Sequence, residues 1–197
     1  MKFLRPVLLF AFVLTEITAS AQAQTCAQGG SPTCGPLCEQ YYNLIWDPYF
    51  TQSDCAAWQF YNGAERALSG TYCAGWSAPF GRFLGPSNGW QQIYQTTYGG
   101  SGGSAYSGAY SFSYRYEIND PLNNPNTHIE VYILQPNSTW YLVDVPPGGS
   151  QFCQGRSINL GLHPEWNGQP IQVYFWALLP GNSNIIINEV GLWQQQP

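Results

Sequence analysis

The stretch AYSFSYRYEI, at residues 109–118, decides the fold class of this chain of 197 residues. Large apolar residues alternate here with polar ones. One side of an extended chain receives Tyr110, Phe112, Tyr114, Tyr116 and Ile118, and the other receives Ser111, Ser113, Arg115 and Glu117. Aromatic residues favour strands. The stretch therefore predicts a β-strand whose aromatic side chains lie in a core.

Similar patterns on both sides of this stretch predict further strands, at 41–46, 56–61, 91–98, 128–134, 139–145, 156–162, 170–178 and 184–193. Turn-forming residues separate them, as in Asn119-Asp120-Pro121 and Pro180-Gly181-Asn182. Residues 62–90 and 99–108 look irregular, and no window predicts an amphipathic helix. We expect an all-β domain over 41–197, an antiparallel two-sheet β-sandwich or jelly roll.

The first residues have the pattern of a secretory signal. Lys2 and Arg5 precede the apolar run 6–14, and Ala21-Gln22-Ala23 provides a cleavage site of small residues. We therefore expect a signal peptide over 1–23 and a secreted protein, either extracellular or periplasmic. Residues 24–40 are rich in Cys, Gly and Pro, and form a predicted Cys-rich leader.

Six cysteines follow the predicted signal peptide, namely Cys26, Cys34, Cys38, Cys55, Cys73 and Cys153. An even number in an exported chain predicts disulfide bonds, and the spacing leaves all fifteen pairings open. His128 and His163 are remote from the cysteines, so we expect no metal site.

Charged residues make up only 9% of the chain. Beyond the predicted signal peptide the chain has no lysine, and its cations are Arg66, Arg82, Arg115 and Arg156. So few cations argue against nucleic acid as a partner and against an anionic membrane surface. No later segment is long and apolar enough for membrane insertion. The oligomeric state stays open.

Five segments, in order, resemble carbohydrate-binding modules of the CenC type. They are Asn43-Leu44-Ile45-Trp46-Asp47-Pro48-Tyr49-Phe50, Trp58 with Asn62-Gly63-Ala64, Gln92-Ile93-Tyr94-Gln95, Tyr110 to Tyr116, and Ile185 to Leu192. The resemblance spans about 43–193. It implies a galactose-binding-like β-jelly roll that binds polysaccharide.

Many members of that family hold a structural calcium ion, which the resemblance would bring with it. Thr51 and Asn188 stand where the family has acidic residues. Because Ca²⁺ prefers several oxygen ligands that include carboxylates, we expect no calcium here and no other cofactor.

Alternation on the later strands predicts a candidate binding surface. If Val173 and Phe175 point inward, one face gathers Tyr132, Tyr174 and Trp176 among Arg115, Glu117, Glu130 and Gln172. Aromatic rings can stack on sugars, and the scarce cations favour a neutral glycan. Alternatively, residues 24–40 or 62–90 cover Tyr174 and Trp176.

Other tryptophans are assigned by their position in the sequence. Trp76 and Trp90, in the irregular stretch 62–90, form a second candidate surface, whereas Trp58 and Trp140 are expected in the core.

Two other functions stay open, besides a non-catalytic carbohydrate-binding protein. One is a structural or interaction protein of the cell surface or matrix, which would use low-charge aromatic surfaces for protein contacts. The other is a glycosidase or polysaccharide lyase, for which Glu117 and Glu130 could supply the paired carboxylates of hydrolysis.

Separately, Asn137-Ser138-Thr139 matches the N-glycosylation sequon.

Overall fold

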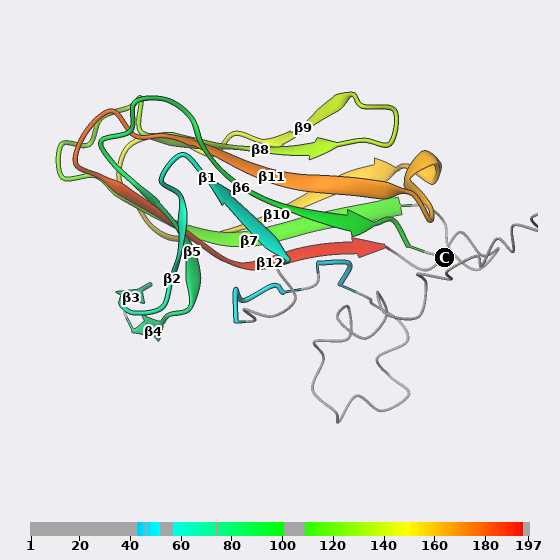
Figure 1. The fold of residues 1–197 in the computed structure, drawn as a ribbon, viewed down its shortest axis with the longest axis horizontal. Helices are drawn as coiled ribbons and strands as arrows, with labels where there is room; N and C mark the ends of the chain where they lie inside the picture. Colours follow the sequence, from blue (N-terminus) through cyan, green and yellow to red (C-terminus); the bar gives the residue numbers. More distant parts are fainter. Residues whose placement is uncertain (1–42, 46, 52–56, 74, 101–108, 195–197) are drawn as a thin grey trace, which may run out of the picture.

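A computed structural model describes residues 43–45, 47–51, 57–73, 75–100 and 109–194. It is a β-sandwich of two five-stranded antiparallel sheets (Figure 1). The first sheet contains, in spatial order, β1 (Trp58–Tyr61), β6 (Gln91–Tyr98), β11 (Pro170–Leu178), β8 (His128–Leu134) and β9 (Trp140–Asp144). The second contains β10 (Gln151–Leu162), β7 (Ala109–Asn119), β12 (Asn184–Gln194), β5 (Phe80–Leu84) and β2 (Glu65–Ala67).

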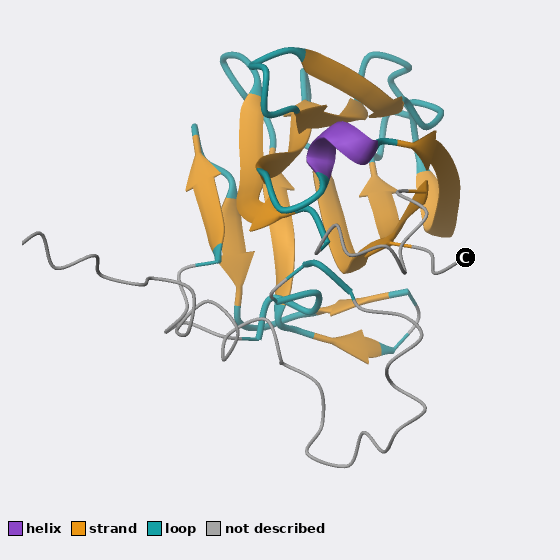
Figure 2. Cartoon of the chain, turned by 90° about the vertical axis from the view of Figure 1, so that its right-hand side faces the viewer, coloured by secondary structure: helices purple, strands orange, loops and turns teal. Residues whose placement is uncertain are grey.

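Two small elements complete the fold. A two-stranded hairpin, β3 (Thr71–Tyr72) and β4 (Trp76–Ser77), lies beyond β2 and β5 (Figure 1). A single 3-10 turn, η2 (Pro164–Trp166), lies at the end of the sandwich that faces the viewer in Figure 2. Within the described part of the chain, no helix is long and apolar enough to cross a membrane.

The all-β, two-sheet prediction is confirmed, and strands 91–98, 128–134 and 170–178 have the predicted bounds. The stretch 62–90 was wrongly expected to be irregular, because it contains β2 to β5. These strands have two to five residues, too few to show a clear alternation. The expected strand at 41–46 is, in its described part, a single bridge between Asn43 and Trp193.

Several expectations fall on undescribed residues. The predicted signal peptide (1–23), the leader (24–40) and Cys26, Cys34, Cys38 and Cys55 lie outside the described residues. The other two cysteines, Cys73 and Cys153, form a disulfide bond.

The core lies between the sheets and is largely aromatic. The four aromatic residues of β7 from Tyr110 to Tyr116 are at most 2% exposed, as predicted. Phe175 of β11 meets two of them, with ring centroids 6.1 Å from Phe112 and 5.4 Å from Tyr114. Trp58 is also buried, as predicted, and its ring centroid lies 6.1 Å from Phe175.

The β3–β4 hairpin adds a second, smaller core on the outer side of the second sheet. Ile185 and Ile187 point into the main core, whereas Ile186 packs with Tyr72 and Phe80 beneath the hairpin. The disulfide bond between Cys73 and Cys153 ties the hairpin to β10. This packing explains why three consecutive isoleucines on one strand are all buried.

A largely buried carboxylate joins the two sheets along one open side of the sandwich. Asp144, on edge strand β9, accepts hydrogen bonds from Arg156 Nε and Nη2 of β10, both at 2.8 Å, and from the Tyr114 hydroxyl at 2.8 Å. Burial alone would raise the pKa of Asp144, but the bonds from Arg156 and Tyr114 outweigh it and lower that pKa. The carboxylate therefore stabilises the folded protein in its ionised form.

We predict that Asp144→Asn lowers the free energy of unfolding at pH 7 by about 2 kcal/mol. This figure is smaller than for a fully buried ion pair, because solvent screens the partly exposed Arg156. In the unmodified protein this contribution is present above the ordinary pKa of 3.8 and is lost as the pH falls through the lowered folded-state pKa. Denaturant titrations at neutral and acidic pH would measure both effects. The matched control is Glu65→Gln, because the Glu65–Arg82 pair is more exposed. Equal effects of the two substitutions would contradict the prediction.

Candidate functional site

The outer side of the first sheet carries a continuous set of aromatic side chains, which we call the aromatic face. Its members are Tyr61, Trp90, Tyr94, Tyr132, Trp140, Tyr174 and Trp176. Their inward neighbours on the central strands, such as Ile93, Val131 and Phe175, are fully buried. Because side chains alternate along a strand, burial of those neighbours turns the aromatic residues outward.

Strand register aligns the centre of the aromatic face. Tyr94, Tyr174 and Tyr132 are direct cross-strand neighbours on β6, β11 and β8. The Tyr94 and Tyr174 rings stack, with centroids 4.6 Å apart and planes inclined by 19°, and Tyr61 stacks on Tyr94 from the other side at 5.7 Å. Rings stacked in this way cover part of each other's faces.

Trp140 differs from these stacked tyrosines. It was expected in the core, and this is wrong, because it lies on edge strand β9 and is 46% exposed. Its ring is inclined by 73° to Tyr174, 63° to Trp176 and 79° to Tyr132. No described aromatic ring stacks parallel to it, and the exposed part of Trp140 offers apolar surface that the C–H groups of a sugar ring can contact.

Hydrogen bonds hold the aromatic face in place. The Tyr174 hydroxyl donates to Gln172 Oε1 at 2.8 Å, and the Tyr132 hydroxyl donates to Glu130 Oε2 at 2.7 Å. The nitrogen of the Trp176 indole is buried, and no described residue accepts its hydrogen bond.

Little charge lies on this surface. None of the five strands of the first sheet contains lysine or arginine, and all four arginines after residue 23 lie on strands of the second sheet. Glu130 lies 3.5 Å from His128, whose ring meets Trp90 edge-on. The strands of this sheet therefore offer an anionic ligand no arginine or lysine to pair with, and Glu130 would repel it.

The structure divides the predicted binding residues between two surfaces. Tyr132, Tyr174, Trp176, Glu130 and Gln172 share the outer side of the first sheet, as the alternation predicted. Two segments were considered as a cover for Tyr174 and Trp176. From the first, residues 62–90, Trp90 reaches this surface and contacts Trp176. The second, residues 24–40, lies outside the described residues.

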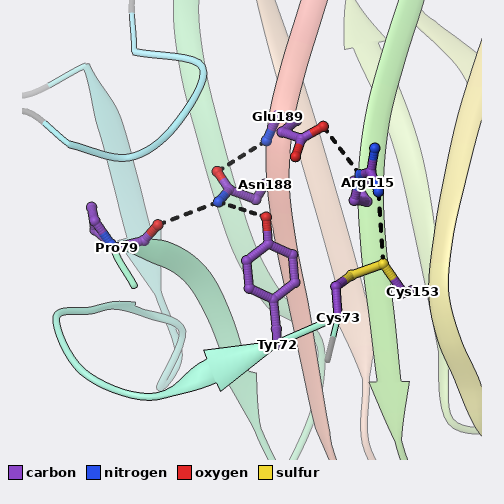
Figure 3. Close-up of polar contacts among 7 residues, drawn as sticks. All are labelled: Tyr72, Cys73, Pro79, Arg115, Cys153, Asn188 and Glu189. Carbon is purple, nitrogen blue, oxygen red and sulfur yellow. Dashed lines mark hydrogen bonds and ion pairs between the residues drawn. A yellow bond between two sulfur atoms is a disulfide. The ribbon is translucent and has the colours of Figure 1, made fainter. Parts of the chain in front are cut away.

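Arg115 and Glu117 were expected on the same face, and this is wrong. Both lie on β7 of the second sheet, because β7 pairs with β10 and β12. Arg115 pairs with Glu189 at 3.1 Å and lies 3.8 Å from Cys153 Sγ (Figure 3). Glu117 accepts a hydrogen bond from the Cys73 amide at 2.7 Å. Glu117 and Glu130 lie on different sheets, so they do not form the carboxylate pair expected for a glycosidase.

The backbones of Trp76 and Trp90, the second candidate surface, lie in different parts of the fold. Trp90 joins the aromatic face through Trp176, while the backbone of Trp76 lies in β4 of the hairpin attached to the second sheet. Tyr61, Tyr94 and Trp140 were missed as candidate site residues. Alternation over 91–98 could have identified Tyr94, since the apolar Ile93 fixes which side points inward.

The residues at the implied calcium positions form hydrogen bonds with their neighbours. The Thr51 hydroxyl donates to Asp47 Oδ1 at 3.0 Å. The Asn188 amide is engaged by Tyr72, Pro79 and the Glu189 amide (Figure 3). In the described residues, no three His, Cys, Asp or Glu side chains gather as metal ligands would.

A polar groove adjoins the aromatic face at the Trp90 end. It has a volume of about 690 Å³ and lies between the turn after β1 and the loop from β5 to β6, lined in part by Asn62, Ser87 and Asn88. Asn62 Nδ2 donates to the Trp90 carbonyl at 2.9 Å, which joins the groove to the aromatic face. The lining of the groove supplies amide and hydroxyl groups that can form hydrogen bonds.

No family model matches the chain, and no curated protein matches it by sequence. Among solved structures, a family 61 carbohydrate-binding module in complex with β-1,4-galactotriose is similar, with a TM-score of 0.54 at 10% identity over 78% of this chain and 99% of that one. The C-terminal family 22 carbohydrate-binding module of Clostridium thermocellum Xyn10B matches with a TM-score of 0.50 at 14% identity, covering 75% and 91%. An exo-β-agarase matches with a TM-score of 0.51 at 9% identity, covering 72% of this chain and 23% of that one.

Identities this low show the fold alone. The chain shares the β-sandwich of carbohydrate-binding modules, and the CenC type stays a prediction.

A prediction concerns the tyrosine stack. A hydrogen bond with Tyr61, together with burial, raises the pKa of Tyr94 to about 12. We expect Tyr61→Phe to lower the pKa of Tyr94 toward the ordinary value of about 10, because the bond to the neutral hydroxyl is lost. NMR of ring-labelled tyrosines over alkaline pH would measure this. Tyr98→Phe, on the same strand as Tyr94, is the matched control. An unchanged Tyr94 pKa in Tyr61→Phe would contradict the assignment.

Proposed function

We propose that the chain is an exported, non-catalytic protein that binds neutral carbohydrate on the aromatic face. The single observation that carries this is the gathering of seven aromatic side chains on the outer side of one sheet, connected by direct ring contacts. An exposed apolar surface of this kind needs a reason, because it would otherwise favour aggregation. A sugar ring has apolar C–H surfaces, which can contact the aromatic rings of this face, and hydroxyl groups, which can bond to its polar side chains.

Charge supports a neutral ligand. The first sheet has no arginine or lysine with which to pair a uronic acid or a sulfate, while Glu130 supplies a negative charge. Carboxylate, hydroxyl and amide groups can instead accept hydrogen bonds from sugar hydroxyls. Neutral polysaccharides are therefore the proposed partners.

The fold comparison supports the same class of function. The family 61 module has its structure in complex with β-1,4-galactotriose, which makes a β-linked galactan a sensible first ligand to test. Among the described residues, Glu117 and Glu130 are the carboxylates considered for hydrolysis, and their separation onto two sheets argues for binding without catalysis. Export rests on the pattern of residues 1–23 and on the disulfide bond.

The test is retention of the purified protein on insoluble neutral polysaccharides, together with a glycan array. We expect retention on at least one neutral glycan, none on polygalacturonate, and no release of reducing sugars. We predict that Trp140→Ala weakens binding at least about tenfold, because truncation of a tryptophan that anchors a ligand costs about 1.4 kcal/mol or more.

The matched control is Phe152→Ala, since Phe152 is 63% exposed but lies on β10 of the second sheet. It should bind like the unmodified protein. Both variants should keep the unmodified circular dichroism spectrum. Equal binding by Trp140→Ala and the unmodified protein would disprove the location of the site. Absence of retention on every glycan would disprove carbohydrate binding and would favour protein contacts at the same face.

A further inference from the structure

The turn between β8 and β9 contains Asn137-Ser138-Thr139, the one sequon for N-glycosylation in the whole sequence. The Gln135 amide donates to the Thr139 carbonyl, and the Ser138 amide donates to the Gln135 carbonyl, both at 2.9 Å. All three sequon residues are exposed. A glycan attached here would lie in solvent and would displace no part of the core.

The Asn137 side chain folds back on the sequon. Its Oδ1 accepts hydrogen bonds from the Thr139 amide at 3.0 Å and from the Thr139 hydroxyl at 2.6 Å, which forms an Asx-turn. The acceptor amide and the sequon hydroxyl are therefore already together. Both of these hydrogen bonds use Asn137 Oδ1, and Asn137 Nδ2 donates to no described residue. A glycan on Nδ2 would therefore break neither bond.

The turn is also held from the core. Gln135 Nε2 donates to the Thr139 hydroxyl at 3.0 Å, and Gln135 Oε1 accepts from the indole of fully buried Trp166 at 3.2 Å. These contacts fix the position of the hairpin tip relative to the aromatic face. Trp140, the exposed member of that face on β9, follows Asn137 by three residues.

We propose that Asn137 is an N-glycosylation site, and that its glycan shields Trp140 at the β9 edge of the aromatic face. The sugar donor would be an oligosaccharide linked to a polyprenyl diphosphate. A bond forms between Asn137 Nδ2 and C1 of the first sugar, and the bond between C1 and the phosphate oxygen breaks. The diphosphate leaves with the electron pair, and Nδ2 loses one proton. If the face binds carbohydrate, this glycan would compete with the ligand for Trp140, but neither part of this proposal depends on that binding.

The test is secretion of the full chain, with its own first residues, from yeast cells that also secrete a reporter with a known sequon. We expect the intact mass to exceed that of the polypeptide and the excess to disappear after treatment with peptide N-glycosidase. Peptide mapping should then find Asn137 converted to aspartate. A secreted chain of unmodified mass, beside a glycosylated reporter, would overturn the site.

Matched variants separate the sequon from the turn. Thr139→Ala removes the sequon hydroxyl and should abolish the added mass, whereas Thr139→Ser and Ser138→Ala keep the sequon and should retain it. If Thr139→Ala is not secreted, Asn137→Gln gives the same test. Added mass in a secreted variant without the sequon would place the glycan elsewhere and overturn the proposal.

Oxidative footprinting tests the position of the glycan. Hydroxyl-radical oxidation of Trp140 should be slower in the glycosylated protein than after peptide N-glycosidase treatment. Tyr61, 48% exposed at the opposite edge of the same sheet, should react equally in both forms. Equal oxidation of Trp140 in the two forms would overturn the shielding, while the mass measurement would still decide the site.

Discussion

The packing of Phe175 against Phe112 and Tyr114 is the contact on which the rest of the structure depends. It joins the central strand of one sheet to β7 of the other. Because side chains alternate across a strand, burial of Phe175 turns Tyr174 and Trp176 to the opposite side. The core and the aromatic face therefore follow from a single choice of which side of β11 points inward.

The two outer surfaces of the sandwich differ, although the two sheets have the same number of strands. The second sheet holds the four arginines. On its outer side Arg82 pairs with Glu65 and Arg115 pairs with Glu189, whereas Arg156 pairs with Asp144 between the two sheets. The β3–β4 hairpin and the disulfide bond also cover part of it. The ion pairs and the covering hairpin thus lie on the outer side of the second sheet. The outer side of the first sheet is aromatic and carries little charge. Such a surface can contact an uncharged ligand without first removing water from paired ions.

The aromatic face combines two kinds of ring. The tyrosines on β1, β6 and β11 stack on one another, which fixes their positions and limits the conformational entropy that a ligand would have to remove. Trp140 lies on the edge strand, where fewer neighbours cover it. Its strand is held at the far end by the bonds of Asp144 to Arg156 and Tyr114. A rigid surface with an exposed ring at each edge, Tyr61 on β1 and Trp140 on β9, follows from this arrangement.

The sequence by itself determined the long strands and their inward sides, because an alternation over seven or more residues fixes both, as in β6, β7, β8 and β11. It also predicted the tyrosine and tryptophan pattern of β8 and β11 on the outer side. Only the tertiary structure decided which strands share a sheet. That choice separated Arg115 and Glu117 from Tyr174, placed Trp140 on an edge, and buried Ile186 beneath a hairpin. The reason is physical: alternation is a local property of one strand, whereas pairing and cover depend on contacts between residues far apart in the chain.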